Sequence, residues 1–233
     1  MIYKNFITAT FNKREKRFIA YCTLKDGINI VAHVRNTGRC AELLIPGVTV
    51  FLEHAPHSGR KTDYTLVAVQ KGKLIINIDS QSPNQIAYES ILDGTIKLPG
   101  LREKITFSRR EYTYKDSRYD IYLETKSKKV LIEVKGVTLE EEGVVKFPDA
   151  PTLRGIKHLR GLSDAIGDGF VCYVVFIIQL GGNIKYFTTN DVTHPQFKAE
   201  MIKAQQSGVK MVAYDSIIKN ESITADKKIP IRL

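Results

Sequence analysis

The chain has 233 residues, 43% of them hydrophobic and 26% charged, which excludes long disordered stretches and favours one large or two small globular domains. The 35 lysines and arginines against 25 acidic residues give a net charge of +10, which favours polyanionic partners, nucleic acid before anionic membrane. Three scattered cysteines argue against a disulfide framework or a structural zinc site. The first residues lack a signal-peptide core and the longest apolar run, 170–178, is too short to span a bilayer, so we expect a cytoplasmic protein without a membrane partner.

Residues 1–80 are predicted to form a small β-barrel. Runs rich in β-branched and aromatic residues, separated by Gly, Asn and Pro turn signals, give these expected strands: 18–24, 28–34, 48–52, 64–69 and 74–78. Five short strands in so few residues suit an OB-type barrel, although periodicity alone does not separate it from an SH3-like barrel.

Residues 81–233 are predicted to form an α/β domain. Ser82, Pro83 and Gln85 have the pattern of a capping box, so we expect a helix from there to about Asp93 that stops at Gly94. Later elements are expected in the order strand, strand, helix, strand, helix, strand: 119–124, 129–137, 152–166, 171–179, 195–206 and 209–214. This alternation indicates an α/β fold.

Two of these expected strands carry charged residues where a core strand should be apolar. Asp120 interrupts the run 118–123, and Glu133 and Lys135, two residues apart, face the same side of their strand. A buried carboxylate is costly unless it is paired or binds a metal. Two carboxylates and a lysine suit phosphodiester hydrolysis with Mg²⁺ or Mn²⁺, in which the metal activates water and the lysine positions it. Taken alone, E-x-K is more often the solvated face of an edge strand.

The spacing D-(x)12-E-x-K resembles the PD-(D/E)xK nuclease superfamily, and a longer block is more specific. Residues 132–139, IEVKGVTL, and 147–159, FPDAPTLRGIKHL, are similar to the signature of the sugar fermentation stimulation protein A (SfsA) family. The resemblance covers nearly the whole chain. It implies an OB-like DNA-binding barrel at 1–80 and a nuclease-like domain with a mixed central sheet at 81–233. It also implies sequence-non-specific DNA binding and a role in sugar (maltose) utilisation.

The resemblance also implies roles for particular residues. Asp120 and Glu133 would hold Mg²⁺, with the Val134 carbonyl as a third ligand, and Lys135 would position water. Glu89, on the first expected helix, matches an acidic residue that related nucleases supply to the metal, although an ordinary exposed carboxylate is an equal interpretation.

The helix expected at 152–166 carries an apolar face and a basic face. The apolar residues at helical spacing are Leu153, Ile156, Leu159, Leu162 and Ile166. On the other face Arg154, Lys157 and His158 would grip phosphate near the metal, or would form an ordinary solvated face. His158 as a general acid is a further alternative. Asp149 would pair with one of the two cations or only start the helix, and Gln179 would end a strand beside the site or cap a turn.

The expected barrel supplies more basic residues for nucleic acid. The positions expected to contact DNA are Arg14, Arg17, Arg35, Arg39, Arg60 and Lys61, with Asn36 in the turn between two of them. Phe18, Tyr21 and Tyr64 would stack on bases or fill the barrel core.

Two functions therefore remain open from the sequence. The first is a Mg²⁺-dependent deoxyribonuclease, favoured by the intact acidic pair and lysine. The second is a DNA-binding regulator of sugar metabolism without nuclease activity, and RNA as the bound nucleic acid is a third interpretation. The sequence leaves the oligomeric state open, with a homodimer among the alternatives.

Overall fold

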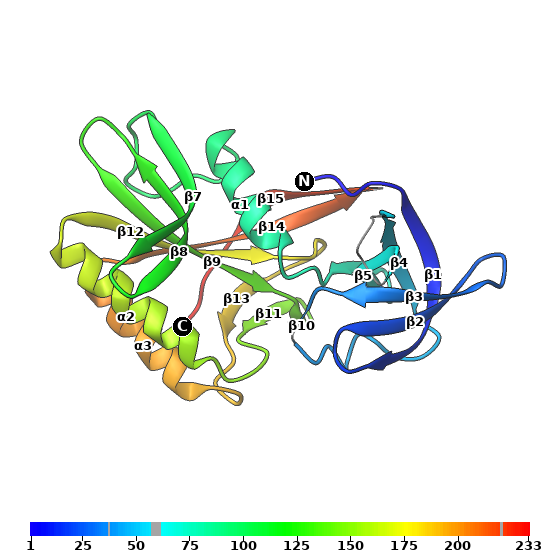
Figure 1. The fold of residues 1–233 in the computed structure, drawn as a ribbon. Helices are drawn as coiled ribbons and strands as arrows, with labels where there is room; N and C mark the ends of the chain where they lie inside the picture. Colours follow the sequence, from blue (N-terminus) through cyan, green and yellow to red (C-terminus); the bar gives the residue numbers. More distant parts are fainter. Residues whose placement is uncertain (37, 57–61, 220) are drawn as a thin grey trace. The chain divides into compact units, whose positions relative to one another are not determined.

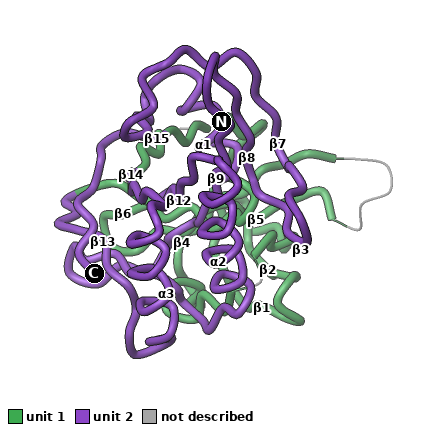
Figure 2. The backbone as a smooth tube through the Cα atoms, turned by 90° about the vertical axis from the view of Figure 1, so that its left-hand side faces the viewer, with its two compact units in different colours: residues 1–82, 179–182, 216–224 green, residues 83–178, 183–215, 225–233 purple. Residues whose placement is uncertain are grey.

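The computed structural model describes residues 1–36, 38–56, 62–219 and 221–233. The backbone divides into two compact units, coloured separately in Figure 2. Unit 1 consists of Met1–Ser82, Gln179–Gly182 and Ser216–Thr224, and unit 2 consists of Pro83–Ile178, Asn183–Asp215 and Ala225–Leu233. Among the described helices, none combines the length and the hydropathy that a membrane span requires.

Unit 1 is built around a closed five-stranded barrel, as the sequence predicts (Figure 1). The barrel strands are β1 (Phe6–Glu15), β2 (Ile19–Leu24), β3 (Asn29–Val34), β4 (Thr49–His54) and β5 (Tyr64–Lys71), and a sixth strand, β6 (Leu74–Asn77), pairs with β5. They are hydrogen-bonded in the order β3-β2-β1-β4-β5-β6, and a parallel pairing of β3 with β5 closes the ring. Inward side chains such as Phe11, Leu52 and Leu66 are almost completely buried and form the barrel core.

The strand β1 was not among the strands expected from the sequence. It pairs with both β2 and β4, so the barrel would not close without it. Its register shifts between Phe11 and Lys13, and its last residues are mostly charged. A bulge of this kind interrupts the alternation of apolar and polar residues, which is the signal that identifies strands in a sequence.

Unit 2 contains a mixed central sheet, as expected, and three assigned helices (Figure 1). The strands of this sheet are β7 (Phe107–Tyr114), β8 (Ser117–Glu124), β9 (Lys129–Val137), β12 (Phe170–Ile178), β14 (Lys210–Lys219) and β15 (Ser222–Ile229). Their order is β15-β14-β12-β9-β8-β7, in which β12 is parallel to both neighbours and β8 is antiparallel to both. The helices are α1 (Ser82–Leu92), α2 (Leu153–Gly167) and α3 (Pro195–Gln206), and α2 packs against β12 and α3.

The sequence missed the polar and the very short elements of unit 2. The edge strand β7, FSRREYTY, is too polar to stand out, and β15 resembles it in this respect. A small sheet is formed by β10 (Leu139–Glu141), β11 (Val144–Phe147) and β13 (Tyr186–Thr189), whose strands are too short for a periodic signal.

The start of α1 is where the sequence predicts it, but the expected capping box is wrong. The hydroxyl of Ser82 donates to the Asp79 carbonyl and to Asn77 Oδ1. The amide of Gln85 donates to Glu89 and accepts from Arg110. Both side chains are thus engaged by tertiary partners, which replace the local reciprocal bonds of a capping box.

Candidate active site

Asp120 lies where strands β8 and β9 separate. The two strands pair as far as Ile121 with Ile132, and the next step would place Asp120 opposite Glu133. There Asp120 Oδ2 accepts a hydrogen bond from the Val134 N–H at 2.7 Å, so that a carboxylate takes the place of a main-chain acceptor. Asn84, in the first turn of α1, donates to Oδ1 at 2.7 Å. The carboxylate is therefore held through both oxygens.

Glu133 is buried, and its two carboxylate oxygens differ. Oε1 contacts Lys135 Nζ at 2.6 Å and His158 Nδ1 at 2.5 Å. Oε2 is buried and has no hydrogen-bond partner among the described residues. The Lys135 contact confirms that the two side chains lie on the same side of β9. An unsatisfied buried acceptor costs on the order of 1–3 kcal/mol, and more when it is charged, so Oε2 is suited to a cation.

His158 is a buried partner of Glu133, which corrects its expected place on an exposed, phosphate-gripping face. Its side chain is 6% exposed, and the ring centroid lies 5.6 Å from that of Tyr119. Arg154 Nε donates to Nε2 at 3.4 Å, so Nε2 is the accepting nitrogen and the Nδ1–H donates to Glu133. This arrangement orients the carboxylate.

The buried face of α2 also differs from the predicted apolar face. The residues that it buries are Gly155, His158, Leu159, Leu162 and Ala165. Leu153, expected in the apolar face, is 79% exposed. The helix approaches its neighbours closely: a Cβ at Gly161 would lie 2.2 Å from the Tyr119 hydroxyl, and one at Gly155 would lie 3.1 Å from Phe197. Part of the face by which α2 packs against its neighbours therefore consists of small residues. A prediction based on large apolar residues places the buried face at the wrong angle around the helix.

The pKa values of the two carboxyls are displaced in opposite directions. Burial, together with the negative charge of Glu133, raises the pKa of Asp120 to about 6. Burial also acts to raise the pKa of Glu133, but the Lys135 charge and the His158 hydrogen bond outweigh it and the pKa is lowered. Glu133 is thus held ionised at neutral pH, and Asp120 keeps its charge only above about pH 6.

The donor set fits a hard divalent cation that retains water ligands. Mg²⁺ is commonly bound by one or two carboxylates, with waters or substrate oxygens completing the shell. Glu89 accepts a hydrogen bond from Gln85. Across the described part of the chain, no three acidic, histidine or cysteine side chains converge as a metal-binding group, so Glu89 does not complete one with Asp120 and Glu133.

Arg14 is a structural residue of the barrel, which corrects its expected contact with DNA. Its guanidinium donates to four main-chain carbonyls at 2.6–3.0 Å, those of Arg17, Asn36, Gly38 and Arg39. Four of its five N–H groups are used in this way. The Asn36 side chain is also internal, because it donates to the Ile78 carbonyl and accepts from Gly38.

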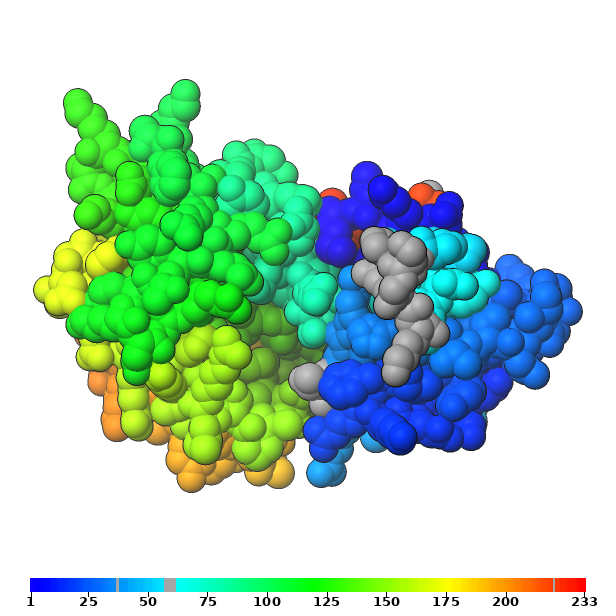
Figure 3. Space-filling view, in the orientation of Figure 1, coloured from blue at the N-terminus to red at the C-terminus, as the bar shows by residue number. Residues whose placement is uncertain are grey.

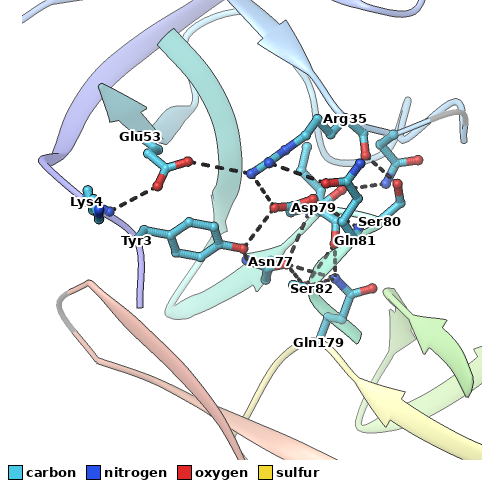
Figure 4. A network of polar contacts seen from close by, with 12 residues as sticks. Tyr3, Lys4, Arg35, Glu53, Asn77, Asp79, Ser80, Gln81, Ser82 and Gln179 are labelled. Atoms are coloured by element: carbon cyan, nitrogen blue, oxygen red, sulfur yellow. Dashed lines mark hydrogen bonds and ion pairs between the residues drawn. The ribbon is translucent and has the colours of Figure 1, made fainter. Parts of the chain in front are cut away.

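Arg35 and Gln179 belong to a polar network within unit 1 (Figure 4). Arg35 forms a 2.6 Å ion pair with Asp79, whose side chain is completely buried, so Arg35 is another internal cation where a DNA contact was expected. Gln179 Nε2 donates to Asn77 Oδ1 at 2.8 Å, to the Asp79 carbonyl at 3.1 Å and to Ser82 Oγ at 3.2 Å. Gln179 therefore caps the turn that leads from the barrel into α1.

The other predicted nucleic-acid contacts are on the surface or outside the described residues. Arg17, Arg39 and Arg154 are exposed. Lys157 pairs with Asp116 at 3.0 Å, where Asp149 was one expected partner, and Asp149 itself is exposed. The remaining two positions, Arg60 and Lys61, lie outside the described residues.

Comparison with known proteins gives a consistent family assignment. A model described as the sugar fermentation stimulation protein RE domain matches residues 81–222, and the SfsA N-terminal OB domain matches residues 13–78. A sugar fermentation stimulation protein homolog of Desulfitobacterium hafniense is 47% identical over 233 residues, 100% of this chain and 99% of the relative. A homolog of Clostridium beijerinckii is 47% identical over 223 residues, 96% of each protein. The solved structure of Pyrococcus furiosus SfsA in complex with Ca²⁺ matches with a TM-score of 0.85 and 26% identity, over 100% of this chain and 98% of that one. The chain belongs to the SfsA family of sugar fermentation stimulation proteins.

Proposed function

We propose that this protein is a metal-dependent phosphodiesterase of the nuclease type that binds DNA without sequence preference. The observation that carries the proposal is the buried Glu133 oxygen without a partner among the described residues, next to a second carboxylate and a lysine. A purely structural carboxylate in this position would be expected to have both oxygens satisfied. The Pyrococcus furiosus relative was solved with Ca²⁺, a hard cation that prefers oxygen ligands as Mg²⁺ does.

Each residue has a distinct task in this proposal. Asp120 and Glu133 would hold the cation, and Asn84 and His158 keep the two carboxylates oriented. A bound Mg²⁺ or Mn²⁺ would supply Lewis-acid activation of water and stabilise charge on the phosphate. Lys135, whose Nζ is 2.6 Å from Glu133, would donate to the attacking water or to a phosphate oxygen.

Exposed cations account for the DNA binding in this proposal. Arg154 lies in the first turn of α2, four residues before His158, the histidine that orients Glu133. Arg17 and Arg39 are exposed on the barrel unit. Contacts of this kind are made to phosphates and carry no sequence information, so the binding should be non-specific and weakened by salt.

The decisive experiment is cleavage of plasmid and single-stranded DNA with Mg²⁺ or Mn²⁺. Glu133→Gln keeps the shape of the side chain and removes its charge, and Glu141→Gln removes an exposed carboxylate of β10 as the matched control. We expect cutting by the wild type and the control, with at least a hundredfold loss in Glu133→Gln. In calorimetric titration, Ca²⁺ should bind to the wild type and to the control, and its affinity should be lost or much weaker in Glu133→Gln.

DNA binding without cutting in any of the three proteins would refute the nuclease proposal. It would favour the alternative of a DNA-binding regulator of sugar metabolism, in which Asp120, Glu133 and Lys135 are retained without catalytic use.

A further inference from the structure

The outer face of strands β2 and β3 carries aromatic and apolar side chains that the barrel core does not use. Along β2, Ala20 and Cys22 are buried, and Tyr21 between them points outward. Tyr21 is paired across the sheet with Val31 of β3 and with Lys13 of β1. Residues paired in this way share one face of a sheet, so these side chains form a row across three strands.

A second aromatic group lies one step along the same face. Ile19 pairs with His33, two residues from the pair formed by Tyr21 and Val31. Phe18, at the entry to β2, is 44% exposed, and its ring lies nearly parallel to that of His33 with centroids 6.4 Å apart. Residues two apart in a strand are separated by roughly 7 Å, so the Phe18–His33 pair is the neighbour of Tyr21 along the strand.

The face is hollowed beside Tyr21. A cavity of about 410 Å³ is lined by Lys13, Tyr21, Asn29 and Val31 among others. A volume of this size lies in the range of about 300–1,000 Å³ that small-molecule pockets occupy, so a nucleobase and its sugar would fit. Asn29 is exposed, and because its Oδ1 already accepts from Thr23 at 2.8 Å, its NH2 is the group that can donate to the edge of a base.

The charge around this face suits a polyanion. Lys16 and Arg17 form the turn between β1 and β2, both with positive φ, and both side chains are exposed. Lys13 lies with its Nζ 4.7 Å from the centre of the Tyr21 ring and is paired with Glu15, which also accepts a hydrogen bond from the Tyr21 hydroxyl at 3.2 Å. Because the Lys13 side chain is 61% exposed, this surface pair contributes little, and the ammonium can exchange Glu15 for a phosphate. In Figure 3, where colour marks position along the sequence, the strands that carry this face belong to the blue part of the surface.

We propose that Phe18, Tyr21, Val31 and His33, together called the stacking face, bind single-stranded nucleic acid. Unpaired bases would stack on Tyr21 and on the Phe18–His33 pair, while Lys13, Lys16 and Arg17 contact the phosphates. A duplex does not offer its bases in this way, because they are stacked on one another. The inference rests on the proposed function for the identity of the partner class and adds to it a single-strand site in unit 1.

The test is a binding measurement in EDTA, where cleavage does not occur. Fluorescence anisotropy would compare labelled oligothymidylate, oligouridylate and a duplex of the same length. Tyr21→Leu keeps apolar bulk without a ring, Tyr21→Phe keeps the ring, and Phe18→Ala removes the second group. Tyr186→Leu is the matched control, because Arg232 lies over the Tyr186 ring at 4.5 Å in unit 2 as Lys13 does over Tyr21.

We expect Tyr21→Leu and Phe18→Ala to weaken binding of at least one single strand by about 5- to 150-fold, the range for loss of one stacked base. Tyr21→Phe and the control should bind as the wild type does, and duplex affinity should change by less than about twofold. A larger loss with oligothymidylate or with oligouridylate identifies DNA or RNA as the partner. Melting temperatures of all variants would show that they are folded.

Equal losses for duplex and single strand, or none in either variant, would overturn the stacking face. Plasmid cleavage is scored separately with metal. A stacking face that fails while cleavage persists leaves the nuclease proposal standing, whereas cleavage that is absent while Tyr21→Leu still loses single-strand affinity overturns only the nuclease proposal.

Discussion

Replacing Asp120 by asparagine should stabilise the metal-free protein. The pKa of Asp120 is raised from 3.8 to about 6, first by burial and then by the negative charge of Glu133. A change of that size in pKa corresponds to about 3 kcal/mol of free energy, by which the ionised carboxylate weakens the fold at neutral pH. The asparagine side chain would lose the charge and keep a carbonyl oxygen for the Val134 N–H, while its NH2 would replace the oxygen that accepts from Asn84, so the Asn84 amide has to turn its own oxygen toward it. We therefore expect a gain of up to about 3 kcal/mol.

The pH dependence gives the sign of the effect. Because the folded protein holds the Asp120 proton to a higher pH than the unfolded chain does, the free energy of unfolding falls as pH rises from about 4 to about 6. The variant lacks this fall, so the two proteins should differ least near pH 4 and most above pH 7. A gain of about 3 kcal/mol raises the melting temperature by roughly 6–12 °C in a chain of this length.

The assay is thermal unfolding in EDTA, followed by circular dichroism because the chain contains no tryptophan. Asp164→Asn, at an exposed position of α2, is the control and should change little. Added Ca²⁺ should stabilise the wild type and leave Asp120→Asn unchanged, since only the intact carboxylate pair would bind the ion. A variant less stable than the wild type at pH 7.5, or a difference that persists at pH 4, would refute the reasoning.

Three further substitutions test the packing and the structural polar contacts. Arg14→Met should lower the free energy of unfolding by about 1–3 kcal/mol in urea denaturation, because partly buried carbonyls lose a charged donor, and its nucleic-acid affinity should fall no further than that of Arg17→Met. Gly161→Ala should lower the free energy of unfolding by about 2 kcal/mol or more, since its Cβ would lie 2.2 Å from the Tyr119 hydroxyl. Gly167→Ala, whose Cβ would have nothing within 4 Å, should be neutral or stabilising when both variants are compared by thermal unfolding. Gln179→Ala should destabilise by about 1–3 kcal/mol while Ca²⁺ affinity measured by calorimetry is unchanged; a large loss of Ca²⁺ affinity would place Gln179 in the metal site after all.

The sequence predicted those elements whose periodicity is undisturbed. Strand β9 has the expected bounds, and α3 runs over Pro195–Gln206 as expected. Strands β1 and β7 escaped because a bulge or a polar edge removes the alternation that periodicity requires. Their positions are fixed by pairing with neighbours, which is tertiary information.

The core of the candidate site could be predicted because it depends on short-range geometry. Glu133 and Lys135 are two residues apart in one strand, and Asp120 is in the strand paired with it. The role of His158 could not be predicted, because its contact with Glu133 spans 25 residues and depends on how α2 rotates against the sheet. Asn84 likewise reaches Asp120 only in the folded domain. Its place as a polar residue in the first turn of an expected helix could have marked it as a candidate site residue.

Contacts that form only in the folded protein also change what the net charge means for DNA binding. Nine basic or histidine side chains were expected to contact DNA, but Arg14, Arg35 and His158 are engaged by carbonyls or buried carboxylates. An internal guanidinium adds to the formal charge of +10 and yet releases no counterion from DNA. Six phosphate contacts, counting Arg60 and Lys61 outside the described residues, would give a slope of log affinity against log salt of roughly −5 on duplex DNA, where nine contacts would give roughly −8. A basic composition sets an upper limit on phosphate contacts, and the hydrogen-bond partners of each cation decide how many of them remain.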